Sequence, residues 1–485
     1  MRISYIFNAL GLICKYVGIV IAVPILVALY YNDIYSIKPF LTASVVSIVL
    51  GFVLNNKNIK NDYLNDLKKS EGLLIVLLSW VSFAMISSIP YYFYGFDFIN
   101  ATFEAVSSAT TTGSTVLTHY DYPKAMFFWR SFCQWLGGMG IIVLFIAILP
   151  QFKVAGRQMF FAEAPGPGED KITPRIRNTA TALWAIYVIF TIVEIVFLKF
   201  SGMSLFHAFC TSFSTLSSGG LSPNPQSIQG YNNLGVVWIV ALFLFFTSLN
   251  FSLLYSVWAK KKPGLFFKNE EFKLYVKILV SLIVLIILSL VFIDKFSFSE
   301  AFTHGLFQVV SFQSGGGFSS IDYTKFNDFA KVILLIAMAM GACAGSTCGG
   351  IKIVRFLLIF KYINTEIKKI IHPNAVYPIR INNQMVPKDV MTQIITFVCF
   401  YAMVLIISIL LVMVIEGDVT VATTGVLSAI NNVGIAFGLI GPTGSFETLH
   451  GATKMILAAN MLIGRLEVIP FIALFSKDFW KFKNY

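Results

Sequence analysis

The chain has 485 residues, of which 57% are hydrophobic, 15% aromatic and 12% charged. Soluble domains carry about 25% charged residues, so this composition and a mean hydropathy of +0.77 exclude an ordinary soluble protein and predict a polytopic membrane protein. The net charge of +12 does not indicate nucleic-acid binding, because the basic residues fall between long apolar stretches, where they set topology and contact anionic lipid.

Ten apolar stretches, taken in chain order, are candidates for membrane spans. A span needs roughly 17–25 residues, so the second stretch is marginal and the eighth is too long for one simple helix. The stretches are 9–31, 39–54, 73–93, 125–149, 179–199, 234–258, 275–293, 329–360, 390–415 and 452–475.

Basic residues mark one side of the membrane. Four connections, 55–72, 150–178, 259–274 and 361–389, hold four or five Lys or Arg each, whereas the opposite connections hold few. Because cytoplasmic loops carry an excess of Lys and Arg, we expect these connections and both termini to lie in the cytoplasm.

The four larger connections on the other side are 94–124, 200–233, 294–328 and 416–451. Each contains a short, weakly apolar stretch followed by residues rich in Gly, Ser, Thr or Asn. Such a stretch is too short to span the membrane and is typical of a re-entrant helix that returns to the side from which it came.

These connections align without gaps. They read FEAVSSATTTGST (103–115), CTSFSTLSSGGLS (210–222), FQVVSFQSGGGFS (307–319) and TGVLSAINNVGIA (424–436). One column contains Gly113, Gly220, Gly317 and Gly434, and six residues earlier a second column contains Ser107, Ser214, Ser311 and Ser428. The alignment predicts helix, pore loop and helix four times over, behind two leading helices.

Four glycine-bearing loops around one axis suit ion conduction. Backbone carbonyls arranged in a ring can replace the hydration shell of an ion, and Gly adopts the required backbone conformations at low steric cost. The loops carry no ring of Asp or Glu, which disfavours a divalent cation, and no ring of Lys or Arg, which disfavours an anion. Loops that merely reverse the chain are the alternative interpretation of any single copy.

The long stretch 329–360 contains GACAGSTCGG (341–350) near its middle. Each Gly costs about 1 kcal/mol in a helix, so we expect two half-helices flanking a loop below the filter. Helix packing through small residues is an alternative. A phosphate-binding loop is not, because Ile351 interrupts the motif and no strand precedes it.

Charged residues within the apolar stretches are Arg130, Glu194, Arg465 and Glu467. We interpret Arg130 as a helix-end residue that snorkels to the interface, and Glu194 as one member of an inter-helix pair. Arg465 lies in mid-helix, where a charge usually faces an interior pathway. The sequence contains no recognisable nucleophile, base or metal cluster, so we expect no enzyme and no cofactor.

The motifs TTTGST (110–115), WRSFCQWLGGMGIIVLFIAILP (129–150), RQMFFAEAPGP (157–167), GSTCGGIK (345–352) and GRLEVIP (464–470) resemble the Trk/Ktr/HKT superfamily of potassium transporters. Within it the chain is similar to the bacterial TrkH type, which has two additional amino-terminal helices. The resemblance covers nearly the whole chain. It implies a homodimer in which each protomer has its own pore, a cytosolic RCK-type nucleotide-binding regulatory subunit, and the bacterial cytoplasmic (inner) membrane.

The resemblance also implies which residues act. The expected potassium filter, which binds the ion through backbone carbonyls, comprises Thr111, Thr112, Gly113, Gly219, Gly220, Gly316, Gly317, Val433 and Gly434. The expected gate comprises Gly345, Ser346, Thr347, Gly349, Gly350, Lys352 and Arg465. In this superfamily Ser in the first filter position accompanies sodium conduction, so four glycines favour potassium.

The sequence thus predicts an all-α polytopic membrane protein with four tandem helix–pore loop–helix repeats around one pore. Its parts are two leading helices (1–70) and four repeats (71–152, 153–262, 263–370 and 371–485), the third with the gate loop. The expected function is potassium uptake through a gated filter. A proton- or sodium-coupled symporter on the same scaffold is the alternative, although no chain of intramembrane carboxylates indicates a proton relay.

Overall fold

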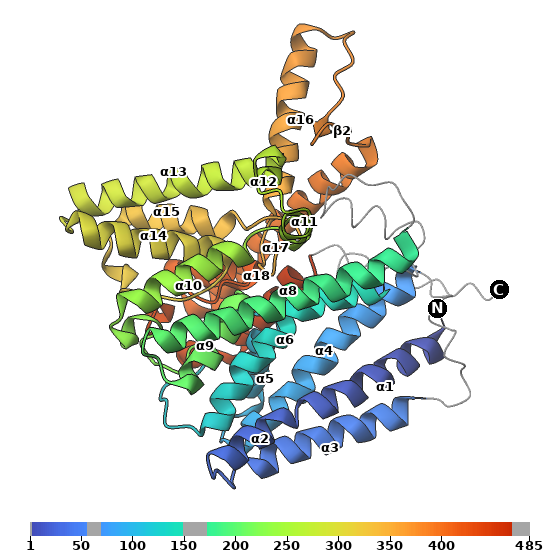
Figure 1. Cartoon of the computed structure of the whole chain (residues 1–485), viewed down its shortest axis with the longest axis vertical. Coiled ribbons are helices and arrows are strands. Elements are labelled where there is room, and N and C mark those ends of the chain that lie inside the picture. Colours follow the sequence, from blue (N-terminus) through green and yellow to red (C-terminus); the bar gives the residue numbers. More distant parts are fainter. Residues whose placement is uncertain (1, 56–68, 149–171, 468–485) are drawn as a thin grey trace.

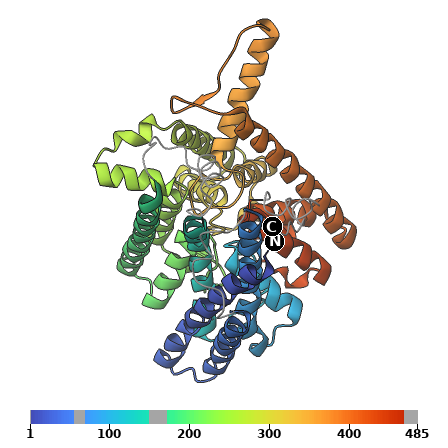
Figure 2. The same ribbon diagram turned by 90° about the vertical axis from the view of Figure 1, so that its right-hand side faces the viewer.

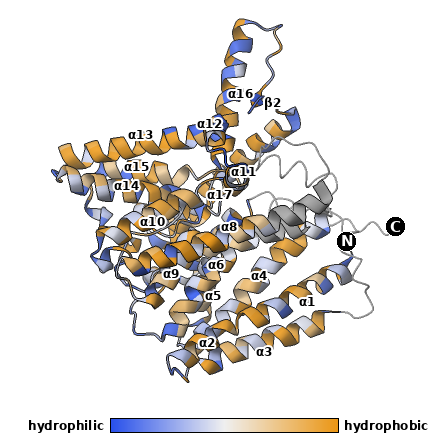
Figure 3. Ribbon diagram, in the orientation of Figure 1, coloured by the Kyte–Doolittle hydropathy of each residue, from blue (hydrophilic) through white to orange (hydrophobic). Residues whose placement is uncertain are grey.

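The computed structural model describes residues 2–55, 69–148 and 172–467. Its regular structure is almost entirely helical, and Figure 1 shows long helices lying side by side with shorter helices between them. Within the described residues the strands are limited to one antiparallel hairpin, β1 (Arg380–Ile381) and β2 (Gln384–Met385). Hydrophobic residues run along most of the length of the outer helices (Figure 3). The predicted α-helical membrane architecture is confirmed.

The chain begins with the predicted leading helices. They are α1 (Ile3–Val20), α2 (Val23–Tyr30) and α3 (Ile37–Leu54), and α1 with α2 makes one stretch long enough to span. Helix α1 packs along α3, where a Cβ on Gly11 would lie 2.9 Å from the carbonyl oxygen of Gly51. Small residues therefore let these two backbones approach closely.

The helices that follow form four units in chain order, each with a long helix, a short helix and a returning helix. Figure 2 shows the successive colours of these units arranged around a common centre. The units are α4 (Lys69–Phe93), α5 (Phe98–Ala109) and α6 (Lys124–Ile148); α8 (Ile172–Phe200), α9 (Leu205–Leu216), α10 (Leu234–Thr247), α11 (Phe251–Lys260) and α12 (Gly264–Lys268); α13 (Glu270–Phe292), α14 (Phe298–Ser314), α15 (Asp328–Ala339) and α16 (Ile353–Ile371); and α17 (Lys388–Glu416), α18 (Val419–Asn431) and α19 (Gly451–Arg465).

The short second helices α5, α9, α14 and α18 have 12, 12, 17 and 13 residues, fewer than the roughly 20 that cross a bilayer. Each begins at a polar residue whose side chain accepts a hydrogen bond from a backbone amide of the first turn, which satisfies a group the helix leaves unpaired. These residues are Asp97, Ser204, Ser297 and Asp418.

Two predicted spans are not continuous helices. The stretch 234–258, expected as one span, bends by 94° between α10 and α11. The bend occurs because Ser248 and Asn250 hydrogen-bond locally: Ser248 Oγ donates to the Leu244 carbonyl, and Asn250 caps α11. The stretch 329–360 is broken between Ala339 and Ile353, as its glycines predict.

Six helical stretches of the described chain are long and apolar enough to cross a membrane, or seven if the bent pair counts as one span. This is fewer than the ten predicted, in part because α15 and α19 are short. The predicted repeat boundary at 152 and 153, the RQMFFAEAPGP stretch and the end of the predicted span 452–475 lie outside the described residues.

Candidate functional site

The four aligned glycines lie close together in the structure. Each lies against the carbonyl oxygen of the residue that precedes the aligned glycine in the next copy. An ideal Cβ would lie 2.0 Å from that oxygen for Gly113 against Gly219, 2.4 Å for Gly220 against Gly316, 2.3 Å for Gly317 against Val433, and 2.1 Å for Gly434 against Thr112. The contacts run from each copy to the next and from the fourth back to the first, so the loops form a closed ring with no room for a side chain at any of the four glycines.

The backbone conformation repeats around this ring. All four aligned glycines have positive φ, between +61° and +94°. The residues two positions earlier are also left-handed: Thr111 (54°), Ser218 (56°), Gly315 (72°) and Asn432 (54°). Left-handed backbone costs a residue with a side chain roughly 1–2 kcal/mol and persists only where the surroundings impose it. These four left-handed positions were not predicted from the sequence, although Gly315 and Asn432 are residue types that favour this conformation.

The aligned serines end the short helices in the same way in every copy. Each serine carbonyl accepts a hydrogen bond from the amide of the residue before the aligned glycine, at 2.8–3.0 Å. The side chains differ: Ser107 Oγ donates to the Ser114 carbonyl (2.6 Å) and Ser311 Oγ to the Phe318 carbonyl (2.7 Å). Within the described residues, the hydroxyls of Ser214 and Ser428 have no hydrogen-bond partner.

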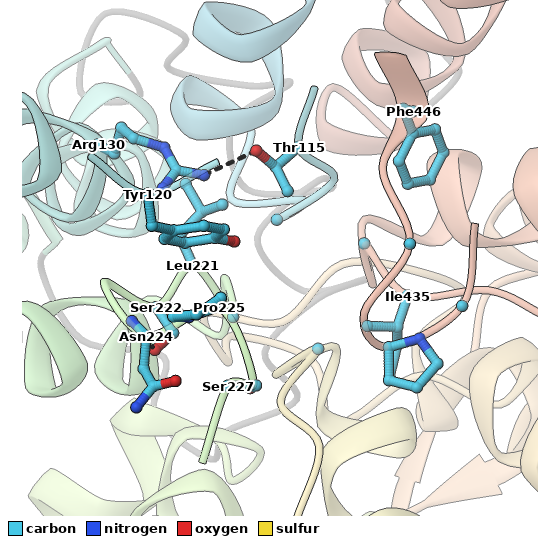
Figure 4. A pocket seen from close by; sticks show the side chains of 17 residues that line it. Thr115, Tyr120, Arg130, Leu221, Ser222, Asn224, Pro225, Ser227, Ile435 and Phe446 are labelled. Atoms are coloured by element: carbon cyan, nitrogen blue, oxygen red, sulfur yellow. Dashed lines mark hydrogen bonds between the residues drawn. The ribbon is translucent and has the colours of Figure 1, made fainter. Parts of the chain in front are cut away.

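A cavity opens beside the ring, and all four aligned glycines line it. Figure 4 shows Arg130, Tyr120 and Thr115 on one side of this cavity, with Ile435 and Phe446 on the other. Arg130 is the one charged side chain among the residues that line it in the described part of the chain. The cavity beside the ring is therefore lined mainly by uncharged residues.

Contacts behind the ring hold neighbouring copies together. The carbonyl two residues after the aligned glycine is bonded in three copies: Thr115 accepts from the Phe446 amide (2.9 Å), Ser319 from the Gln229 amide (3.0 Å) and Ala436 from the Tyr323 hydroxyl (2.9 Å). Between the first two copies, the buried Gln134 donates through Nε2 to the Gly219 carbonyl at 2.6 Å. Sequence reasoning missed these residues because their partners lie far away in the chain.

The loop between α15 and α16 lies across the inner ends of two short helices. Thr347 Oγ1 donates to the carbonyl of Leu216, the last residue of α9, at 3.0 Å. A Cβ on Gly349 would lie 2.4 Å from the carbonyl oxygen of Asn431, the last residue of α18. Gly345 and Gly350 adopt positive φ, so the glycines serve both the turn of the chain and its close packing.

The loop between α15 and α16 also hydrogen-bonds to the bend between α10 and α11. The Cys343 amide donates to the Ser248 carbonyl (3.0 Å), and the Phe251 amide donates to the Gly345 carbonyl (3.1 Å). Within the loop, Ser346 Oγ donates to the Cys343 carbonyl at 2.6 Å. The bend and the loop, neither of which is helical, therefore provide hydrogen-bond partners for each other's backbone amides and carbonyls.

Arg465, the last residue of α19, is buried beneath the loop. Its Nη1 donates to the Thr347 carbonyl and its Nη2 to the Gly137 carbonyl, both at 2.9 Å. The structure thus brings Arg465 and the expected gate residues together. Lys352, also buried, donates to the Cys348 carbonyl at the far end of the loop.

Two interpretations of the intramembrane charges are wrong. Arg130 does not snorkel: it is 1% exposed and forms an ion pair at 2.7 Å with Glu104, which is fully buried, because both project between α5 and α6. Glu194 has no ionic partner within the described residues, and neither carboxylate oxygen makes a hydrogen bond, although Thr215 of α9 lies near. Glu467 pairs with Arg355 of α16 at 2.5 Å.

Within the described residues, no group of three His, Cys, Asp or Glu side chains could hold a metal ion.

Comparisons with known proteins agree with this geometry. A family model described as "TrkH: Cation transport protein" matches residues 36–482. The chain is 36% identical to the Trk system potassium uptake protein TrkH of Escherichia coli K12, over 99% of this chain and 100% of that protein. It is 32% identical to the Trk system potassium uptake protein TrkG of the same organism, over 94% of each chain.

A solved structure is also similar. The crystal structure of the potassium transporter TrkH from Vibrio parahaemolyticus matches with a TM-score of 0.89 and 33% sequence identity, over 99% of this chain and 100% of that one. The expectation of a membrane transporter rather than an enzyme is borne out by these relatives. With a family match across most of its length and full-length relatives above 30% identity, this chain belongs to the TrkH family of cation transport proteins.

Proposed function

We propose that this protein takes up potassium across the bacterial cytoplasmic membrane through the ring of four pore loops. The observation that carries the proposal is the closed ring itself, in which each aligned glycine abuts the preceding carbonyl of the next loop. The curated relatives named above are potassium uptake proteins, which supports the same ion.

The selecting groups are the backbone carbonyls of the expected filter residues. Alternating left-handed positions, at Thr111 and Gly113 in the first loop, turn the backbone so that carbonyls can face a common axis. The carboxyl ends of α5, α9, α14 and α18 point at this region, and their partial negative charge favours a cation. Among the described residues that line the cavity beside the ring, Arg130 is the one charged residue, so these residues form no ring of charge.

The gate in this proposal is the loop 340–352, held by Arg465. The loop lies across the inner side of the ring, and the Arg465 guanidinium joins it to Gly137 in the middle of α6. The positive charge of Arg465 opposes the passage of a cation, and its hydrogen bonds keep the loop in place. Conduction requires the loop to move away from the carboxyl ends of α9 and α18.

We also propose that partner proteins regulate the opening of the gate. The protein forms a homodimer with one pore in each protomer, and a cytosolic RCK-type nucleotide-binding subunit acts on the gate. The segment 361–389, which carries five basic residues, projects from the body of the protein with α16 and the hairpin (Figure 1). Its charge supports a cytoplasmic location for this side and for both termini.

Coupled symport is the second candidate, and Glu194 is the observation that favours it. A buried carboxylate without a partner within the described residues is a candidate proton carrier in a membrane protein. The experiment that separates the two functions uses the purified full chain in liposomes. Initial potassium and sodium fluxes are measured with and without an imposed proton gradient.

The channel-like function predicts potassium flux that exceeds sodium flux and reverses with the potassium gradient alone. Uphill potassium movement driven by the proton gradient, and lost in Glu194→Gln, would support symport. Equal flux of both ions in correctly folded protein would contradict a potassium filter.

A further inference from the structure

The first pore loop is braced differently from the other three. The Glu104 side chain in α5 and the Arg130 side chain in α6 form an ion pair that is almost completely shielded from solvent. In the gapless alignment, the position of Glu104 is occupied by Thr211, Gln308 and Gly425 in the other copies. A charged brace at this position therefore belongs to the first loop alone.

The ion pair hydrogen-bonds to Thr115 and Val116, which follow the first aligned glycine, Gly113. Arg130 donates through Nε to Glu104 (2.7 Å) and through Nη2 to Thr115 Oγ1 (2.9 Å), as Figure 4 shows for Thr115. Glu104 accepts from the Val116 amide at 3.0 Å and from the Thr115 hydroxyl at 3.1 Å. One carboxylate and one guanidinium thus fix two consecutive residues of the loop.

Hydrogen bonds also link this part of the first loop to the fourth repeat. The Thr115 carbonyl accepts from the Phe446 amide in the fourth repeat (2.9 Å), and Ser114 Oγ donates to the Gly434 carbonyl (3.3 Å). Thr115 lies two residues from Gly113, where the ring leaves no room for a side chain. A shift of Thr115 would therefore move the first loop against both of its neighbours in the ring.

We propose that the Glu104–Arg130 pair determines ion preference by positioning the first filter loop, with Thr115 as the residue through which it acts. Glu104 and Arg130 are positioning residues, since the carboxylate is occupied by Arg130, Thr115 and Val116 rather than exposed to an ion. A rigid brace matters because carbonyls select between ions only where the surroundings hold their geometry. This inference rests on the proposed potassium-uptake function.

The test compares conservative variants of the full chain in liposomes. Arg130→Lys keeps the charge, but a single ammonium cannot reproduce the fork that reaches both Glu104 and Thr115. Thr115→Val removes the shared hydroxyl with little change in shape, and Thr115→Ser restores it. We expect Arg130→Lys and Thr115→Val to reduce the ratio of potassium to sodium flux by about five- to tenfold, and Thr115→Ser to retain the wild-type ratio.

The matched control is Arg2→Lys. Arg2, which precedes α1, also forms an arginine–glutamate pair, with the buried Glu71 at the start of α4, and neither residue lines the cavity beside the ring. It should leave the flux ratio unchanged. Thermal unfolding of every variant reports whether the fold is retained, and Thr115→Val keeps the proposal testable if Arg130→Lys does not fold.

An unchanged flux ratio in folded Thr115→Val or Arg130→Lys, with lowered thermal stability alone, would overturn the proposal and leave the pair a purely structural one. The wild-type protein in the same liposomes separates this result from failure of the proposed function. If the wild type itself does not prefer potassium, the function is wrong. If it does and the variants behave like it, only the positioning role is wrong.

Discussion

Gly113 combines two constraints that a side chain would violate. Its φ is +94°, and a Cβ would lie 2.0 Å from the Gly219 carbonyl oxygen, which is backbone and cannot rotate away. We predict that Gly113→Ser displaces the second loop and lowers the ratio of potassium to sodium flux by about tenfold, with the fold retained. The measurement is the flux ratio in liposomes, alongside thermal unfolding.

Gly95 provides the matched control for this substitution. Its φ is +91°, but nothing lies within 4 Å of its Cβ position. Gly95→Ser therefore imposes the same backbone strain, roughly 1–2 kcal/mol, without crowding the ring. If both variants lower the flux ratio equally, the loss reflects general strain, and the assignment of Gly113 to the filter is incorrect.

Arg465 is the residue whose removal most directly tests the gate. Its two hydrogen bonds join the Thr347 carbonyl to the Gly137 carbonyl, and its charge lies on the inner side of the ring. Arg465→Ala removes both the link and the positive charge, so we predict potassium flux at least about tenfold faster in the absence of any regulatory partner.

Arg465→Lys separates the two contributions. Lys retains the charge, but its single ammonium cannot span both carbonyls as the guanidinium does. We expect an intermediate flux, slower than that of the Ala variant. Loss of flux in correctly inserted Arg465→Ala protein would show that the residue is required for conduction, contrary to the gate we propose.

At the level of structural elements, the fourfold arrangement of pore loops depends on the short helices α5, α9, α14 and α18 being re-entrant. If α5 is re-entrant, the connections at its two ends lie on the same side of the membrane. Cysteines at Asp97 and Asp121, both exposed, should then react with an impermeant thiol reagent added from outside intact cells, on a background without other cysteines. Loss of the Asp97 cap costs only about 1 kcal/mol, which should not unfold the protein.

Helix α6 supplies the control position for this labelling. A cysteine at Gly140, well inside that helix, should not react in the same cells. Reaction of Asp97→Cys from outside and of Asp121→Cys only from the cytoplasmic side would mean that α5 and its loop cross the membrane. The four-loop arrangement would then be wrong.

The sequence predicts those features that depend on local residue type. The glycine and serine columns identify four loops because each loop must satisfy the same backbone geometry, and the four glycines of 341–350 identify a break because they are poor helix formers. Such local patterns can be recognised in a single sequence.

Features that depend on distant partners could not be predicted in this way. The Glu104–Arg130 pair joins residues in different helices, so Arg130 alone resembled an exposed helix end. The bend at Ser248 is stabilised by an amide almost a hundred residues away, at Cys343, while the surrounding apolar run resembles a continuous span. Sequence patterns give no indication of which buried polar groups meet in the fold.

For the molecule as a whole, the four repeats share a fold but not their chemistry. The first loop is braced by an ion pair, the second is held by Gln134, and the third repeat supplies the loop that contacts the carboxyl ends of α9 and α18. Because one chain encodes all four copies, each can diverge without altering the others. In the proposed function, therefore, a single ring of four unequal loops is the place where the ion is selected.

That assignment can be tested by locating the ion directly. Rubidium has nearly the size and chemistry of potassium and scatters X-rays anomalously, so crystals grown in rubidium would reveal bound cations. We predict an anomalous peak on the axis of the ring formed by Gly113, Gly220, Gly317 and Gly434, and its loss when sodium replaces rubidium. Rubidium peaks elsewhere in the protein, with none at the ring, would show that the four loops are not where the ion is selected.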